Sequence, residues 1–155
     1  MSTIKQLILP ISHLYQVIFS KFNLLQSVAL LSARFYVGWA FFASGITKLR
    51  DWDSTLFLFE EEYQVPLLPF ELAAYLGTAA EIILPLLLML GLTSRFAAFG
   101  LFFVNIVAVI SLEDIAAVAY AEHVLWGGLL AQVVIFSGGR FTVDFLIKNK
   151  LIPTK

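Results

Sequence analysis

The chain has 155 residues, of which 60% are hydrophobic and 14% charged, and its formal net charge is −1. A soluble domain has about half apolar and about a quarter charged residues, so this composition excludes a soluble enzyme. The chain has no cysteine, which excludes disulfides and thiol chemistry, and no basic excess that would suit nucleic acid.

The first segment, residues 7–25, has apolar side chains at roughly helical spacing after Lys5. Pro10, His13 and Gln16 interrupt the apolar run and no small-residue cleavage site ends it, so it does not resemble a cleavable signal peptide. We expect an amphipathic helix that lies in the membrane interface. The alternative is a remnant of a broken transmembrane segment.

Four longer apolar segments follow, each close to the roughly 18–20 residues that a membrane-spanning helix needs. They lie at residues 28–48, 69–92, 95–112 and 115–136. An acidic loop separates the first two segments, and the tail at 141–151 has the pattern of a short interfacial helix. The sequence therefore predicts an all-α integral membrane protein: a four-helix bundle in one transmembrane domain over residues 1–155, with an interfacial helix at each end.

The residues between the segments predict where helices begin and end. Thr93 or Ser94 can cap the third spanning helix, and the acidic pair at 113–114 suits the N-terminus of the fourth. The glycine pair at 138–139 is typical of a C-terminal helix cap.

Basic residues predict the orientation. Only Lys48 and Arg50 lie on one side of the predicted spans, whereas the other side carries Lys5, Lys21, Arg95, Arg140, Lys148, Lys150 and Lys155. Because cytoplasmic loops carry the excess of Lys and Arg, both termini are expected in the cytoplasm. The opposite face is acidic. In a bacterium, this would be a multi-pass protein of the inner membrane.

Glu81 is the most informative polar residue in the predicted spans. It lies about 18 Å along the second span, near the middle of the membrane, where a carboxyl group must be protonated, paired or turned to a polar cavity. Pro85 removes the backbone donor for the carbonyl of Glu81, so we expect a bend there. We predict a catalytic, proton-handling role for Glu81. The alternative is a structural ion pair or hydrogen bond between helices.

Arg34 and Lys48 lie on a similar face of the first span, about 21 Å apart along the axis. They cannot serve one small site together, and Glu81 lies at an intermediate depth, so that pairing with either is open. We predict a cofactor-binding role for both. For each, the alternative is an anchor at the membrane surface.

His123 lies in the fourth span, with Trp126 one turn away on the same side. Histidine exchanges a proton near neutral pH and can hydrogen-bond a quinone-type hydroxyl or carbonyl, so we predict a catalytic role for His123 and a cofactor-binding role for Trp126. The alternative is an aromatic belt at the membrane surface. Asn105 joins the cofactor-binding set, although an interhelical hydrogen bond is the reading we favour. No metal site is expected, because the chain has two His and no Cys.

Three stretches resemble the motifs of a known membrane family, DoxX, and the likeness covers about residues 33–144. They are Arg34-x3-Gly38-x3-Phe42-x2-Gly45-x2-Lys48 in the first span, Glu81-x3-Pro85 with Gly91-Leu92-Thr93-Ser94-Arg95 in the second span and turn, and Gly138-Gly139-Arg140-x3-Asp144 in the tail. The tail departs from the commoner Gly-Pro-Gly form. The stretch Glu122-His123-x2-Trp126-Gly127 resembles the HvfX-like branch. The resemblance implies a four-helix bundle.

The resemblance also implies a choice of functions. The family takes its name from a small subunit of a thiosulfate:quinone oxidoreductase, and other members are linked to redox complexes with partner enzymes. HvfX-like members accompany small secreted metal-responsive peptides and their modifying enzymes. We expect a membrane redox subunit that binds a quinone between helices, handles protons and receives electrons from a partner protein.

Two other functions stay open at this stage. One is a non-enzymatic assembly, scaffold or export partner for a peptide- or metal-handling system, with the acidic loop as its docking surface. The other is a small transporter, which would need an oligomer to provide a pathway. The sequence does not decide whether the chain is itself an enzyme.

Overall fold

The computed structural model describes the backbone of residues 2–151 and the side chains of residues 21–150. The elements in this part of the chain are helices, joined by short connections that include one isolated β-bridge between Tyr63 and Leu112. In chain order the helices are α1 (Ser2–Arg50), α2 (Trp52–Glu61), α3 (Phe70–Leu90), α4 (Ser94–Ser111), α5 (Ala117–Phe136) and α6 (Val143–Leu151).

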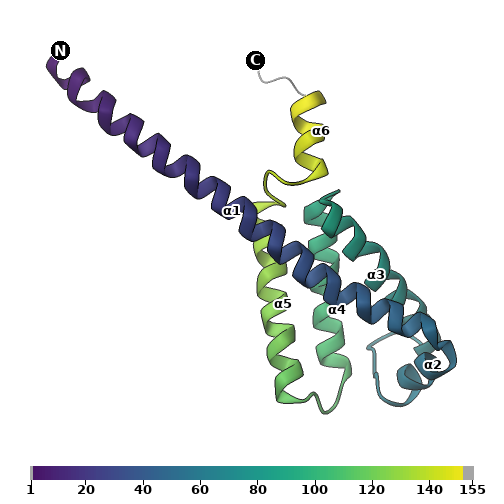
Figure 1. Cartoon of the computed structure of the whole chain (residues 1–155). Helices are drawn as coiled ribbons and strands as arrows, with labels where there is room; N and C mark the ends of the chain where they lie inside the picture. The colour runs from purple at the N-terminus through teal and green to yellow at the C-terminus, as the bar shows by residue number, and fades with distance from the viewer. Residues whose placement is uncertain (1, 152–155) are drawn as a thin grey trace.

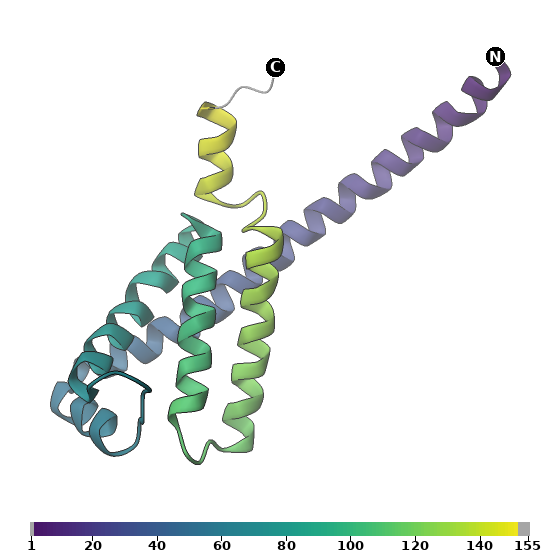
Figure 2. The ribbon, with the colours of Figure 1, turned by 180° about the vertical axis from the view of Figure 1, so that it is seen from behind.

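Four of these helices are long and apolar enough to cross a membrane: α1 from Lys21 onward, α3, α4 and α5. Helix α1 packs against α3 and α5, α3 packs against α4, and α4 packs against α5, so the four close a ring. Figure 1 shows α1 crossing one face of the other three obliquely, and Figure 2 shows α4 and α5 side by side on the opposite face. The prediction of an all-α membrane bundle is confirmed.

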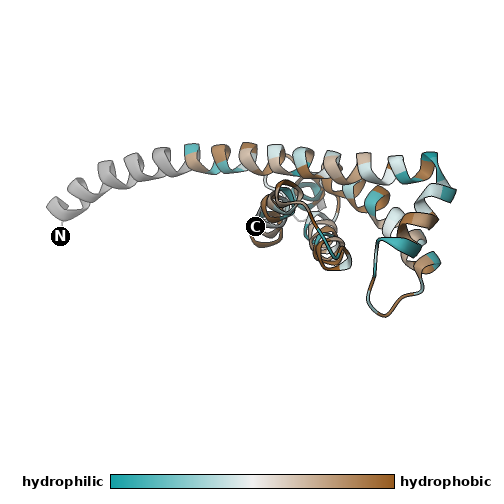
Figure 3. Ribbon diagram, turned by 90° about the horizontal axis from the view of Figure 1, so that it is seen from below, coloured by the Kyte–Doolittle hydropathy of each residue, from teal (hydrophilic) through white to brown (hydrophobic). Residues whose placement is uncertain are grey.

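The outer surface of the spans is apolar. On α4, Phe96, Phe99 and Phe103 are 66%, 62% and 63% exposed, which would be costly in water but suits contact with lipid tails. Figure 3 shows hydrophobic colours along the spanning ribbons and hydrophilic positions around α2. The chain is therefore a multi-pass integral membrane protein in contact with the bilayer.

Residues 7–25 are helical, as expected, but they continue directly into the first span. Between Pro10 and Gly38 the sequence has neither glycine nor proline, so nothing local ends the helix. The result is α1, a helix of 49 residues and about 73 Å at the usual rise. The side chains of residues 7–20, on which an interfacial position depends, lie outside the described part of the chain.

The acidic loop after α1 contains a helix that the sequence analysis did not predict. Asp51 caps α2 by accepting a hydrogen bond from the backbone N–H of Ser54 at 3.0 Å. The buried hydroxyl of Thr55 donates to the carbonyls of Lys48 and Asp51, which fastens α2 to the end of α1. Phe59 then packs on the first half of α3. We call this end of the bundle, where α1 finishes, the acidic end.

The opposite end carries Arg95, Arg140 and Lys148, and we call it the basic end. Two predictions about helix caps are wrong there. Thr93 makes no capping hydrogen bond with its side chain. Instead, a carboxylate from α6 caps α4, as described below. Helix α5 ends on Ser137, which has a φ of 64°, rather than on the glycine pair. The predicted tail helix is present as α6.

Candidate functional site

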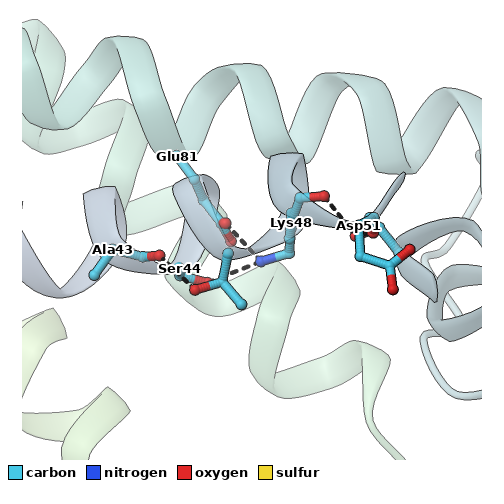
Figure 4. Close-up of polar contacts among 7 residues, drawn as sticks. Ala43, Ser44, Lys48, Asp51 and Glu81 are labelled. Carbon is cyan, nitrogen blue, oxygen red and sulfur yellow. Dashed lines mark hydrogen bonds and ion pairs between the residues drawn. The ribbon is translucent and has the colours of Figure 1, made fainter. Parts of the chain in front are cut away.

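The first polar cluster joins α1 to α3 inside the bundle. Lys48 Nζ lies 2.6 Å from Oε2 of Glu81 and also donates to the hydroxyl of Ser44 at 2.9 Å. The side chains of Lys48 and Glu81 are only 15% and 12% exposed. Figure 4 shows the two converging across the helix seam. An ion pair this little exposed has lost most of its hydration, so each charge depends on the other.

Helix packing explains why Glu81 meets Lys48. A Cβ on Gly45 would lie 2.8 Å from Ile82 and 3.1 Å from the Cβ of Glu81, so glycine allows α1 and α3 to approach closely here. Glu81 lies in the middle of α3, which continues through Pro85. The small residue therefore sets the register that brings lysine and glutamate together.

Two further polar groups accompany this pair, and the sequence analysis did not name them. Thr78 lies one turn before Glu81, is 3% exposed, and its hydroxyl has no hydrogen-bond partner among the described residues. Burial raises the pKa of the Tyr63 phenol, and the charges of Glu81 and Glu62 raise this pKa further. Tyr63, in the α2–α3 connection, is thus within electrostatic reach of the Glu81 carboxylate.

The second cluster joins α4 to α5. Asn105 Nδ2 donates to the backbone carbonyl of His123 at 2.9 Å, and Asn105 Oδ1 lies 2.8 Å from His123 Nδ1. Since a carboxamide oxygen only accepts, Nδ1 must carry a proton. In the neutral ring, Nε2 is then left as an acceptor, and no hydrogen bond from a described residue reaches it. Asn105 therefore fixes both the tautomer and the direction of the imidazole.

Trp126 lies beside this imidazole. Its ring meets His123 edge-on at a centroid distance of 5.0 Å and Phe41 of α1 at 5.6 Å. The indole Nε1 is buried and has no hydrogen-bond partner within the described residues. A buried donor without an acceptor is rare in folded proteins, so this N–H is free to donate to a polar ligand.

The third cluster surrounds Arg34 at the basic end. Arg34 is 1% exposed, and its guanidinium donates to the carbonyls of Gly138, Met89 and Phe141 at 2.8, 3.2 and 2.9 Å. The carbonyl of Met89 belongs to the last turn of α3, where helix carbonyls have no partner of their own. Arg34 thus fastens the ends of α3 and α5 to α1.

Asp144 completes the basic end by capping α4 from a distance in sequence. Its Oδ1 accepts from Thr93 N at 2.7 Å, and its Oδ2 accepts from the backbone and hydroxyl of Ser94, both at 2.8 Å. Burial alone would raise the pKa of Asp144, but these hydrogen bonds and the Arg34 charge outweigh it and lower the pKa. The carboxylate is therefore held in its ionised form.

The predicted site residues fall into these three clusters. The structure brings Glu81 to Lys48, and Asn105 to His123 and Trp126, whereas Arg34 lies at the other end of the bundle. No hydrogen bond among the described residues joins one cluster to another. Sequence reasoning missed Ser44 as a hydrogen-bond partner of Lys48 and Asp144 as the cap of α4. Ser44 lies four residues before Lys48, a helical spacing that would have revealed this contact.

Comparison with known proteins places the chain. The sequence model of the family described as DoxX matches residues 29–114, more than half of the chain. The chain belongs to the DoxX family. An uncharacterized protein of Haemophilus influenzae is 29% identical to it over 137 residues, covering 83% of this chain and 88% of the relative. No solved structure matches the chain.

The DoxX-like run in the first span now has a structural meaning. A Cβ on Gly38 would lie 2.7 Å from Met89, so Gly38 and Gly45 both allow close contact between α1 and α3. Arg34 and Lys48, at the two ends of the run, each hold a polar group of α3. In this DoxX protein, the spacing of the run is thus the spacing of the α1–α3 seam.

Proposed function

We propose that this DoxX-family chain is the membrane subunit of a redox system and binds a quinone at His123 and Trp126. The observation that carries the proposal is a pair of unused groups on α5, the buried indole N–H of Trp126 and Nε2 of His123, on two rings whose centroids lie 5.0 Å apart. Small-molecule sites are mostly apolar with a few convergent polar groups. A donor and an acceptor among aromatic rings match a ring that carries an oxygen function.

Each residue has a distinct task in this proposal. Trp126 donates its N–H to a quinone carbonyl oxygen, while His123 Nε2 accepts from the hydroxyl of the reduced form. Asn105 is a positioning residue, because its two hydrogen bonds hold the imidazole. A quinone would supply the redox chemistry, and a partner protein would supply the electrons.

Glu81 and Lys48 have a supporting place in the proposal. The pair lies on α1 and α3, with no hydrogen bond among the described residues linking it to His123. We therefore assign Glu81 to proton handling on the acidic side of the bundle, near Tyr63, rather than to direct contact with the quinone. The Glu81→Gln variant should accordingly keep its bound quinone.

The decisive experiment measures quinone bound to the protein. The full chain is purified from a quinone-containing host, its bound lipids are extracted, and quinone per protein is determined by chromatography. Trp126→Phe keeps the ring and removes only the N–H, so it should lose most of the quinone. Trp39→Phe is the matched control, because Trp39 is 64% exposed on the lipid side of α1. Wild-type protein that binds neither quinone nor an analogue would refute the proposal.

A non-enzymatic role as a docking partner is the second candidate. Glu60, Glu61 and Glu62 are exposed at the end of α2 and form no ion pair with a described cation, as a docking surface for a basic partner would require. Reversing all three to lysine should abolish co-purification of a membrane partner, whereas Asp114→Lys should not. Unchanged recovery of the partner would reject this surface.

A further inference from the structure

The basic end has two adjoining hollows that the proposed quinone site does not use. One, of about 340 Å³, lies between α1 and α6 and is lined by Ser27, Arg140 and Lys148, among others. The second, of about 550 Å³, lies where α4 begins and includes Arg95. Lys148 lines both hollows, as do Ser137 and Asp144. Together they form one concave surface around Lys148, which we call the basic cleft.

The basic cleft has an uncompensated positive charge. Arg95, Arg140 and Lys148 are exposed, and none forms an ion pair with a carboxylate of the described residues. Arg95 has only a long hydrogen bond, of 3.3 Å, to the carbonyl of Ile135. Asp144 is the single acid of the cleft, and its two oxygens are already taken by the start of α4. The free cations therefore favour an anion.

The level of the cleft in the membrane indicates what kind of anion. It lies where α4 begins and α5 ends, which are ends of membrane-spanning helices and so the level of lipid headgroups. Phe96 and Phe136 line the two hollows and are 66% and 55% exposed. An anion that binds here would have apolar rings on its membrane side. A phosphate group that carries acyl chains satisfies both parts of the surface.

We propose that the basic cleft binds the phosphate headgroup of an anionic phospholipid, with Arg95, Arg140 and Lys148 around the phosphate and Phe96 and Phe136 beside the acyl chains. Basic pockets at the ends of membrane-spanning helices suit such headgroups. The same phosphate chemistry exists in soluble anions, but these would make no use of the exposed rings. The proposal does not depend on quinone binding.

The test measures lipid retention by the full-length protein. Protein in detergent is titrated with phosphatidylglycerol or with phosphatidylcholine, and retained lipid is counted by native mass spectrometry. We expect a preference for phosphatidylglycerol, which falls about 5-fold in Lys148→Gln and again in Lys148→Gln with Arg95→Gln. Lys148→Arg should keep the preference. Arg50→Gln, an exposed cation at the acidic end, is the matched control and should change nothing.

Three outcomes would overturn the proposal. The first is equal retention of the two lipids by the wild type, and the second is the same loss in Arg50→Gln, which would indicate net charge alone. The third concerns inorganic phosphate: if it raises the melting temperature in a Lys148-dependent way while lipids show no preference, the ligand is a soluble phosphate. Circular dichroism and gel filtration of each variant confirm that the substitution leaves the fold intact.

Discussion

The ion pair between Lys48 and Glu81 gives a quantitative prediction about stability. Lys48→Met removes the only donor to the Glu81 carboxylate among the described residues and leaves a charged group that is 12% exposed. Glu81→Gln keeps the shape and an accepting oxygen, and Lys48 keeps its bond to Ser44. The lysine variant should therefore be the more damaging of the two.

The magnitude follows from the burial of the pair. Removing one partner of a buried ion pair costs about 3–5 kcal/mol. Because Lys48 and Glu81 keep some exposure, we place the cost of Lys48→Met at the lower end, about 3 kcal/mol. The accepting oxygen of the glutamine and the bond between Lys48 and Ser44 reduce the cost of Glu81→Gln to about 2 kcal/mol. In the double variant the second change removes no further pairing, so the total cost of both changes should be about 3 kcal/mol. The coupling energy is then about 2 kcal/mol, within the range seen for residues in contact.

The assay is a double-mutant cycle by equilibrium unfolding in mixed micelles, followed by circular dichroism. Arg50→Met, an exposed cation two residues from Lys48, is the control and should change the free energy of unfolding by less than about 0.5 kcal/mol. If the effects of Lys48→Met and Glu81→Gln add within about 0.5 kcal/mol, the pair does not act as a unit and our reasoning about this seam fails.

Three further predictions concern the other clusters. Arg34→Met removes the guanidinium that donates to three backbone carbonyls, so the free energy of unfolding should fall by about 3 kcal/mol or more. Arg34→Lys should recover only part of this loss. Equal stability of both variants and the wild type would contradict the prediction. Asn105→Leu removes both bonds to His123 and should cost about 2 kcal/mol in the same assay, while ring signals of His123 in NMR spectra should show a mixture of tautomers; a single unchanged tautomer would be the adverse result. Since the folded pKa of Asp144 lies below the unfolded one, its stabilisation is complete above the ordinary aspartate pKa of about 3.9 and is lost as the pH falls through the lower folded value. Melting temperatures should therefore fall less with acid in Asp144→Asn than in wild type, and parallel pH profiles would disprove the effect.

The membrane bundle could be predicted from the sequence because a span depends on local properties. Each apolar segment reaches the length that crosses a bilayer, and the connections at 93–94 and 113–116 interrupt the pattern. The second, third and fourth predicted spans agree with α3, α4 and α5 to within a few residues, whereas the first begins far inside α1. The continuity of α1 and the presence of α2 were harder to predict. In α2, acidic residues interrupt a short apolar stripe, and this segment is helical because it packs on α3.

The residues of the clusters were also visible in the sequence, because polar groups in a span are few. Their partners on other helices were not visible. Glu81 could have paired with Arg34 or Lys48 at comparable depth, and the approach of the helices at Gly45 selects Lys48. Asp144 caps a helix about fifty residues earlier in the chain, and no local pattern predicts that contact.

The sequence by itself determined that this chain has four segments long and apolar enough to cross a membrane, with a few polar groups among apolar ones, since both follow from residue type and spacing along a single helix. Only the tertiary structure decided how those groups pair: Lys48 with Glu81, His123 with Asn105, and Arg34 with the ends of two helices. Pairing depends on the register between helices, and that register is set by close contacts at small residues rather than by any one segment.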